Sequence, residues 1–193
     1  MINLSLNEVE TIAAKAARGA GFSWGLAEEI GRAARAMAMK NDAWGEALLA
    51  LGRAANSFEA PSGERIAHWR LGEPDLVTAV SLCPVRTAAL LLDDGSQIDR
   101  EPLRLANVGL PIWLDVMMQR SGNWVADVDD PFAARSDVTI RHAAHAKRAP
   151  AARRAAVAPE ILDALDALAA RTYVPESERS RARGAGGGSV DDE

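Results

Sequence analysis

The side chains with the clearest chemical use lie near the C-terminal end of the chain. This segment combines two arginines with other polar groups and spaced glycines: Arg171, Tyr173, Glu176, Ser180, Arg181, Gly184 and Gly186. Two guanidinium groups can fork onto a carboxylate or phosphate, and glycines let backbone N–H groups approach an anion closely. The pattern predicts a site for a small anionic ligand. A charged flexible tail, or an arm docked on a neighbouring subunit, would use the same residues.

Two residues near the N-terminus extend this candidate site. Asn7 lies inside a predicted helix, where its amide competes with backbone hydrogen bonds, so a tertiary role is expected. Trp24 stands beside Gly25 at a predicted helix start. Its indole can wall a pocket with the N–H directed at a ligand, or it can pack in the core, which is the commoner role. We place the site between Trp24 and the C-terminal segment.

Other clusters of ligating side chains lack the spacing of a metal site. His142 and His145 fall at the end of a predicted strand and not on one helix face. Asp127, Asp129 and Asp130 precede a proline and fit a solvated turn better than a hard-oxygen metal loop. We therefore predict no metal site.

A glycine pattern near the start superficially resembles a dinucleotide-binding loop. Gly19, Gly21 and Gly25 follow a predicted helix, not a strand, and their spacing is one residue too long. A joint between two helices explains them, with glycines supplying positive φ. No G-x-S-x-G, HExxH, P-loop or CxxC motif occurs. The sequence therefore predicts no cofactor and leaves open whether the protein is an enzyme.

Composition limits the partners. The 193-residue chain is 48% hydrophobic, enough for one domain with a substantial core. Its net charge of −5 provides no basic field for nucleic acid or anionic lipid. No apolar run approaches the roughly 20 residues of a membrane span, and the first residues lack a signal-peptide pattern. The single Cys83 is expected to be buried and excludes an intramolecular disulfide. We expect a cytoplasmic protein without nucleic-acid or membrane partners.

Residues 1–56 are predicted to form a helical subdomain. Ser5 and Glu8 match the capping box S-x-x-E, and Gly19 is expected to end the first helix in the left-handed conformation. Ser23 and Asp42 are expected to cap a second and a third helix. Four glycines within these patterns indicate close helix packing or a ligand near the backbone: Gly25, Gly31, Gly45 and Gly52.

Residues 74–142 are predicted to hold a small, mostly antiparallel sheet. The proline- and glycine-rich stretch 56–74 indicates loops. Apolar runs at 76–82 and 85–92 favour strands, although residues 87–90 also suit a helix.

Further signals follow in the same region. The turn sequence DDGS at 93–96 predicts a β-hairpin with arms at 90–92 and 97–99. Residues 110–119 suit a strand or a buried helix, and alternation at 123–128 and 137–142 predicts strands.

The last part of the chain is predicted to form a helix and an arm over residues 159–193. Residues 143–158 are rich in alanine and arginine and indicate a linker or an exposed helix. Pro159 suits the first helical position, and an apolar stripe follows it: Ile161, Leu162, Leu165 and Leu168.

The two ends of the chain resemble an uncharacterised bacterial family, a domain of unknown function common in proteobacteria. The resemblance is carried at the start by residues 5–10 (SLNEVE), 16–21 (AARGAG) and 23–29 (SWGLAEE). At the end it is carried by residues 171–178 (RTYVPESE), 180–181 (SR) and 184–186 (GAG). The family implies no reaction, but its small-molecule catabolic setting makes an accessory subunit of a catabolic enzyme a further expectation.

Together these features predict an α+β fold in a single domain, residues 1–193, with the helical subdomain packed on the sheet. The leading hypothesis is a protein that binds or acts on a small anionic metabolite, or serves as an accessory subunit of such an enzyme. The alternative is a non-catalytic interaction protein that forms a homo-oligomer or joins a partner enzyme. DNA binding is disfavoured because Glu28 and Glu29 would face the phosphates.

Overall fold

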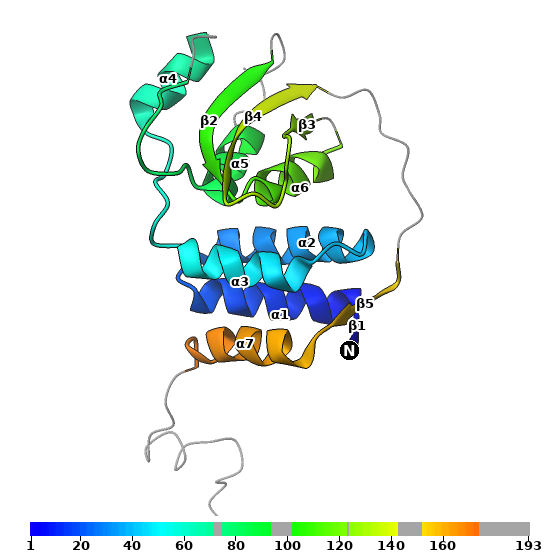
Figure 1. The fold of residues 1–193 in the computed structure, drawn as a ribbon. Coiled ribbons are helices and arrows are strands. Elements are labelled where there is room, and N and C mark those ends of the chain that lie inside the picture. The colour runs from blue at the N-terminus through cyan, green and yellow to red at the C-terminus, as the bar shows by residue number, and fades with distance from the viewer. Residues whose placement is uncertain (72–74, 94–101, 123, 143–151, 174–193) are drawn as a thin grey trace, which may run out of the picture.

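The computed structural model describes residues 1–71, 75–93, 102–122, 124–142 and 152–173. The fold is α+β, as predicted, and its elements stack in layers (Figure 1). One part consists of helices from both ends of the chain: α1 (Leu6–Gly19), α2 (Trp24–Met39), α3 (Trp44–Ala54) and α7 (Pro159–Ala170). Within the described ranges, no helix combines the length and apolar character needed to span a membrane.

The other part holds the sheet and three helices. Strands β2 (Leu103–Gly109), β4 (Arg135–His142) and β3 (Trp124–Asp127) pair antiparallel in the order β2-β4-β3. Helices α5 (Pro84–Asp93) and α6 (Ile112–Arg120) lie between this sheet and α2, and α4 (Gly63–Leu71) lies at its edge (Figure 1). The core is continuous through these layers, so the sheet rests on the N-terminal helices through α5 and α6.

The predicted start of α1 is confirmed. The Glu8 N–H donates to Ser5 Oγ at 3.3 Å, and the Ser5 N–H donates to Glu8 Oε2 at 2.6 Å. This capping box satisfies two backbone donors that the first turn would otherwise leave free. The same bonds hold the pKa of the Glu8 carboxyl below its ordinary value.

Two predicted helix ends were wrong, and a third was right in position only. The residue with positive φ after α1 is Gly21 at +101°, whereas Gly19 is the last helical residue. Ser23 occupies the N-cap of α2 but its side chain makes no capping hydrogen bond. Helix α3 starts from Ala43, and Asp42 contributes only its carbonyl oxygen, which accepts from the Trp44 N–H. The periodic pattern located the helices, but the side-chain caps depend on loop geometry.

The prediction for residues 56–99 was also wrong in part. The expected loop contains α4, and the expected strand at 85–92 is α5, the helical alternative for its centre. The first arm of the expected hairpin therefore belongs to a helix, and residues 94–101 lie outside the described residues. Between residues 76 and 82 only Leu82 makes β-bridges, to Glu59 and Val108.

The predictions for the later part of the chain agree better with the structure. Strands β3 and β4 match the two alternating stretches, the apolar run at 110–119 contains most of the buried helix α6 (Ile112–Arg120), and Pro159 begins α7. Three strands were not predicted: β2, which nevertheless falls in the region expected to hold the sheet, and two strands near the ends of the chain. Strand β1 (Ile2–Ser5) pairs antiparallel with β5 (Arg154–Val157), which falls in the expected linker. This pairing fixes the C-terminal segment beside the start of α1.

Candidate functional site

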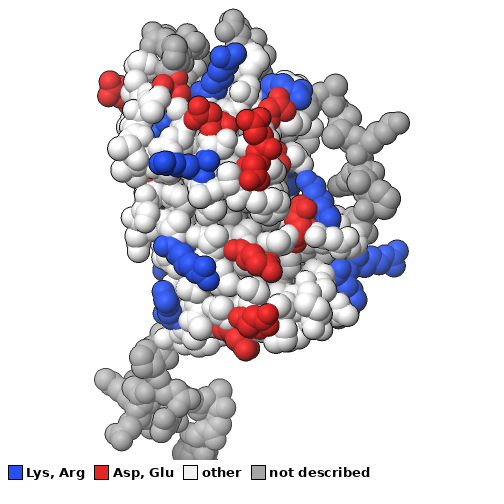
Figure 2. Space-filling model, in the orientation of Figure 1, with Lys and Arg blue, Asp and Glu red and all other residues white. Residues whose placement is uncertain are grey.

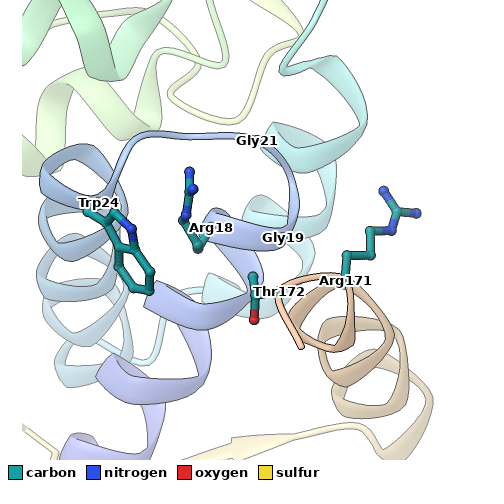
Figure 3. Close-up of a pocket in the computed structure, with 6 residues that line it drawn as sticks. All are labelled: Arg18, Gly19, Gly21, Trp24, Arg171 and Thr172. Carbon is teal, nitrogen blue, oxygen red and sulfur yellow. The ribbon is translucent and has the colours of Figure 1, made fainter. Parts of the chain in front are cut away.

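A pocket of about 370 Å³ lies where the α1–α2 turn meets the end of α7 (Figure 3). Its lining combines two arginines, two glycines, a tryptophan and a threonine: Arg18, Gly19, Gly21, Trp24, Arg171 and Thr172. These residues come from both ends of the chain, so tertiary packing alone brings them together.

Gly19 lies where helix α1 contacts helix α7, near the two ends of the chain. A β-carbon at this position would lie 1.8 Å from the Leu168 carbonyl oxygen, so only glycine permits α7 to approach α1 so closely. The close approach places Arg171 and Thr172, which directly follow α7, beside the α1–α2 turn. Gly21 then reverses the chain with a φ of +101° and leads into α2.

Arg18 is held in place from two sides. Its Nη1 donates to the Phe22 carbonyl oxygen at 2.8 Å, and its guanidinium lies over the Trp24 ring at 5.1 Å from the centroid. A cation over an indole face is attracted by the ring quadrupole. One N–H of Arg18 is thus bonded to the backbone, while the guanidinium lies over the indole ring.

Trp24 differs from the other tryptophans. It is 68% exposed, against 8% or less for the remaining four: Trp44, Trp69, Trp113 and Trp124. The commoner core role does not apply to it, because it occupies the first position of α2, beyond the buried face. An exposed indole next to a guanidinium is a surface that a ligand can use.

On the α7 side of the pocket, Arg171 and Thr172 differ in what they can offer. The Thr172 hydroxyl donates to the Ala169 carbonyl oxygen at 2.7 Å, so its proton is engaged. The Arg171 side chain extends away from Trp24 at the opposite rim (Figure 3). Within residues 152–173 and the other described ranges, no hydrogen bond or ion pair holds its guanidinium.

Backbone donors at the turn are largely engaged. The Gly21 N–H donates to the Arg18 carbonyl oxygen at 3.0 Å, and the Phe22 N–H to that of Ala17 at 3.2 Å. The first turn of α2 contains no acidic residue. The positive end of its dipole therefore lies next to the pocket without a counter-charge from that turn. Anion recognition here depends on the guanidinium groups.

The predicted site residues are only partly brought together. Trp24 and Arg171 line the pocket. Asn7 lies near the opposite end of α1, where Arg35 Nη1 donates to its Oδ1 and to Glu10 Oε2, both at 3.0 Å. Tyr173 is exposed and does not line the pocket. Five predicted residues lie outside the described residues: Glu176, Ser180, Arg181, Gly184 and Gly186.

Sequence reasoning missed the pocket roles of Arg18 and Thr172. Arg18 suits the last turn of a helix by the helix dipole alone, and nothing in a single sequence links residue 18 to residue 171. The aromatic residue six positions after Arg18 is the one local signal, because the tight turn folds the two side chains together.

A buried ionic cluster was also missed. The Arg65 side chain is 2% exposed, and its Nε and Nη2 donate to the two carboxylate oxygens of Asp75 at 2.7 and 2.8 Å. Its Nη1 donates to Glu59 Oε1 at 2.8 Å, and Nη2 also donates to the Ala106 carbonyl oxygen at 2.9 Å. Four of the five N–H donors of this guanidinium are thus bonded to protein groups, so we interpret the cluster as an anchor of α4 on β2.

Other ionisable groups have structural roles. Cys83 is buried, as predicted, and burial raises the pKa of its thiol. His142 packs edge-on against Trp124 with ring centroids 5.0 Å apart. Among the described residues, no three His, Cys, Asp or Glu side chains gather in a way that could hold a metal ion.

Comparison with known proteins gives a match over one part of the chain. Residues 4–42 match the family described as "Protein of unknown function (DUF3726)". This range contains the three N-terminal segments that carry the resemblance. The match ends before the C-terminal segments, so the resemblance there stays a prediction, as does the bacterial distribution. No curated protein and no solved structure matches the chain. The matched region includes α1, the turn and α2, and therefore the part of the pocket formed by Arg18, Gly19, Gly21 and Trp24.

Proposed function

We propose that this protein binds a small anionic metabolite in the pocket between the α1–α2 turn and the end of α7. The observation that carries the proposal is the convergence of Arg18, Arg171 and exposed Trp24 from opposite ends of the chain. Guanidinium groups are matched to carboxylates and phosphates by charge and by their planar fork of N–H donors. No described residue forms a hydrogen bond or ion pair with the Arg171 guanidinium. The side chain can therefore rotate toward a ligand that has first bound to Arg18.

The charge of the pocket supports an anion. The chain carries a net charge of −5, and acidic and basic side chains are interspersed over the face seen in Figure 2. The part of the pocket lining that the structure describes, in contrast, includes two arginines and no carboxylate. A local positive potential on an acidic protein concentrates small anions at that point.

The lining favours binding over catalysis. Among the described residues it holds no carboxylate, histidine, cysteine or lysine, and the Thr172 hydroxyl donates its proton to the Ala169 carbonyl oxygen. General acid–base or nucleophilic catalysis requires one of these groups within reach of the substrate. We therefore assign the pocket a binding role, which also fits an accessory subunit that senses or holds a metabolite.

The alternative, a non-catalytic interaction protein, predicts a large apolar patch on the helices. Among the described residues, the large apolar side chains that are exposed are mostly on strands, loops and ends: Met1, Ile2, Val77, Val80, Phe132 and Tyr173. One further large apolar side chain, that of Trp24, is exposed, and this residue belongs to a helix. This distribution supports the pocket proposal over a helix-mediated oligomer.

Acrylamide quenching of tryptophan fluorescence tests the proposal, because four of the five tryptophans are buried and Trp24 dominates the quenchable emission. We expect sodium phosphate or sodium succinate, at constant ionic strength, to slow quenching in a saturable manner. R171Q should weaken this protection severalfold. R153Q is the matched control, since Arg153 precedes β5 at the opposite end of α1.

Two outcomes would contradict the proposal. One is that no anion in a panel of carboxylates and phosphates protects Trp24. The other is that R171Q and R153Q behave alike. The W24F variant should lose most of the quenchable emission, which verifies that the signal comes from this residue.

A further inference from the structure

We propose that the ligand carries a flat aromatic ring directly attached to its anionic group, so that an aromatic carboxylate or phosphate binds better than an aliphatic one. This inference rests on the proposed function and narrows the chemical class of the ligand. It follows from what the pocket offers to the uncharged part of the molecule.

The largest apolar surface among the described lining residues is flat. Gly19 and Gly21 have no side chain, and Trp24 alone has a large apolar side chain. Thr172 adds only a methyl group, and the two arginines add only their methylene stems. An alkyl chain in this pocket would have no wall to surround it. A planar ring, in contrast, recovers apolar contact by lying against the indole.

The indole is fixed and accessible. The Arg18 guanidinium over its ring and the bond from Arg18 to the Phe22 carbonyl oxygen hold the two side chains together. The indole is nevertheless 68% exposed. Next to it, a β-carbon at Gly25 would meet no atom within 4 Å, so the space beside Trp24 is open. A rigid, open aromatic platform costs a ligand little ordering on binding.

The anion anchor, Arg18, lies over one face of that platform. A guanidinium has five N–H donors, and the structure shows one bond of Arg18, to the Phe22 carbonyl oxygen. The backbone N–H groups of Gly21 and Phe22 are already bonded within the turn. An anion bound to the remaining donors of Arg18 therefore sits beside the indole, and a ring attached to that anion can overlap it. Arg171 then closes on the anion from the opposite rim.

Isothermal titration calorimetry with two matched acids tests the inference. Benzoate and cyclohexanecarboxylate have the same charge and similar size, but only benzoate has a π-face. We expect benzoate to bind about threefold to tenfold more tightly, the range that aromatic pairing supplies beyond area burial. W24F should retain most of this preference, and W24L should abolish it. Phenyl phosphate against inorganic phosphate extends the comparison to phosphates.

The outcomes separate the inference from the proposed function. Equal affinity for the two carboxylates, with R171Q weakening both, would overturn the aromatic preference and leave anion binding intact. A benzoate preference that survives in W24L would also overturn it. Absence of binding by every anion, including phosphate and succinate, would overturn the proposed function itself. Circular dichroism of W24F and W24L confirms that both fold, as expected for an exposed side chain.

Discussion

At the scale of single residues, Arg18 and Arg171 contribute differently to the proposed site. Arg18 is bonded to the Phe22 carbonyl oxygen and covers Trp24, so it also holds the turn in shape. Arg171 follows the last turn of α7 with an open side chain. Substitution of Arg171 therefore tests binding with little change in the fold, whereas substitution of Arg18 would alter both.

Asp115 on α6 predicts a pH dependence of stability. Burial raises the pKa of its carboxyl, opposed by the bond that it accepts from Gln119 and by the charge of Lys40; nearby Asp127 raises it slightly further. The folded-state pKa thus lies above the unfolded value of about 3.9. The stability that this group contributes is fully present below the unfolded pKa and is lost as pH rises through the folded pKa.

The D115N variant cannot ionise at this position. We expect its free energy of unfolding, relative to the wild type, to rise as pH increases above about 4 and to level off once the pH exceeds the folded-state pKa of Asp115. Urea denaturation followed by circular dichroism at several pH values measures the difference. A difference that is constant with pH, or that falls as pH rises, would show that Asp115 is not the group responsible.

Substitution of Arg65 is expected to lower the free energy of unfolding strongly, because it breaks the buried ionic cluster. R65M leaves the buried carboxylate of Asp75 without its bidentate partner, although Trp69 and the Ala106 N–H still donate to it. Breaking a buried pair in this way costs about 3–5 kcal/mol of unfolding free energy. The double variant R65M/D75L, which removes both charges, should recover much of that loss.

Exposed Arg141, which pairs with Asp127 on the sheet surface, provides the control. R141M should change the unfolding free energy little, because solvent screens such pairs. Equal losses for R65M and R141M in chemical denaturation would contradict the structural role assigned to the cluster.

At the scale of elements, the sequence predicted the features that interactions between neighbouring residues determine. The capping box at Ser5 and Glu8, the alternation in β4 and Pro159 at the start of α7 are all read from neighbouring residues. Strand β5 has no such signal, because its pairing partner β1 lies about 150 residues away in sequence. Helix α5 was expected mainly as a strand because its apolar run also suits a sheet, and only its packing against α6 and α2 decides.

The candidate site likewise combines features that residue type predicts with features that depend on tertiary packing. Trp24 and Arg171 could be named from residue type alone, since each is a ligand-binding side chain without a clear structural use. The contact that places Arg171 near the turn, Gly19 against Leu168, depends on the tertiary approach of two helices. No single sequence encodes that approach as a pattern.

Two glycines in α2 give opposite predictions. A β-carbon at Gly31 would lie 2.7 Å from the Glu10 carbonyl oxygen, whereas one at Gly25 would meet nothing within 4 Å. G25A should therefore stabilise the protein by about 1 kcal/mol through helix propensity. G31A should destabilise it, because α1 and α2 must move apart. Thermal unfolding of the two variants measures this, and shifts of the same sign would contradict the packing of α1 on α2.

At the scale of the whole molecule, the pocket exists because the chain brings its two ends together. Strand β5 pairs with β1, α7 packs on α1 and α3, and the end of α7 then reaches the α1–α2 turn (Figure 1). The family match covers residues 4–42, so it supplies only the N-terminal side of the pocket. Anion binding should accordingly depend on the docking of α7 as well as on the arginines.

The most direct test of the central claim is an NMR titration of the tryptophan indole N–H signals. Five signals are expected, one for each tryptophan, and the W24F variant identifies that of Trp24. Sodium benzoate added to the ¹⁵N-labelled wild type should shift the Trp24 signal in a saturable way, leave the four buried indoles nearly unchanged, and shift Trp24 far less in R171Q. An unmoved Trp24 signal at saturating anion, or equal shifts in the wild type and R171Q, would contradict a binding site between Trp24 and Arg171.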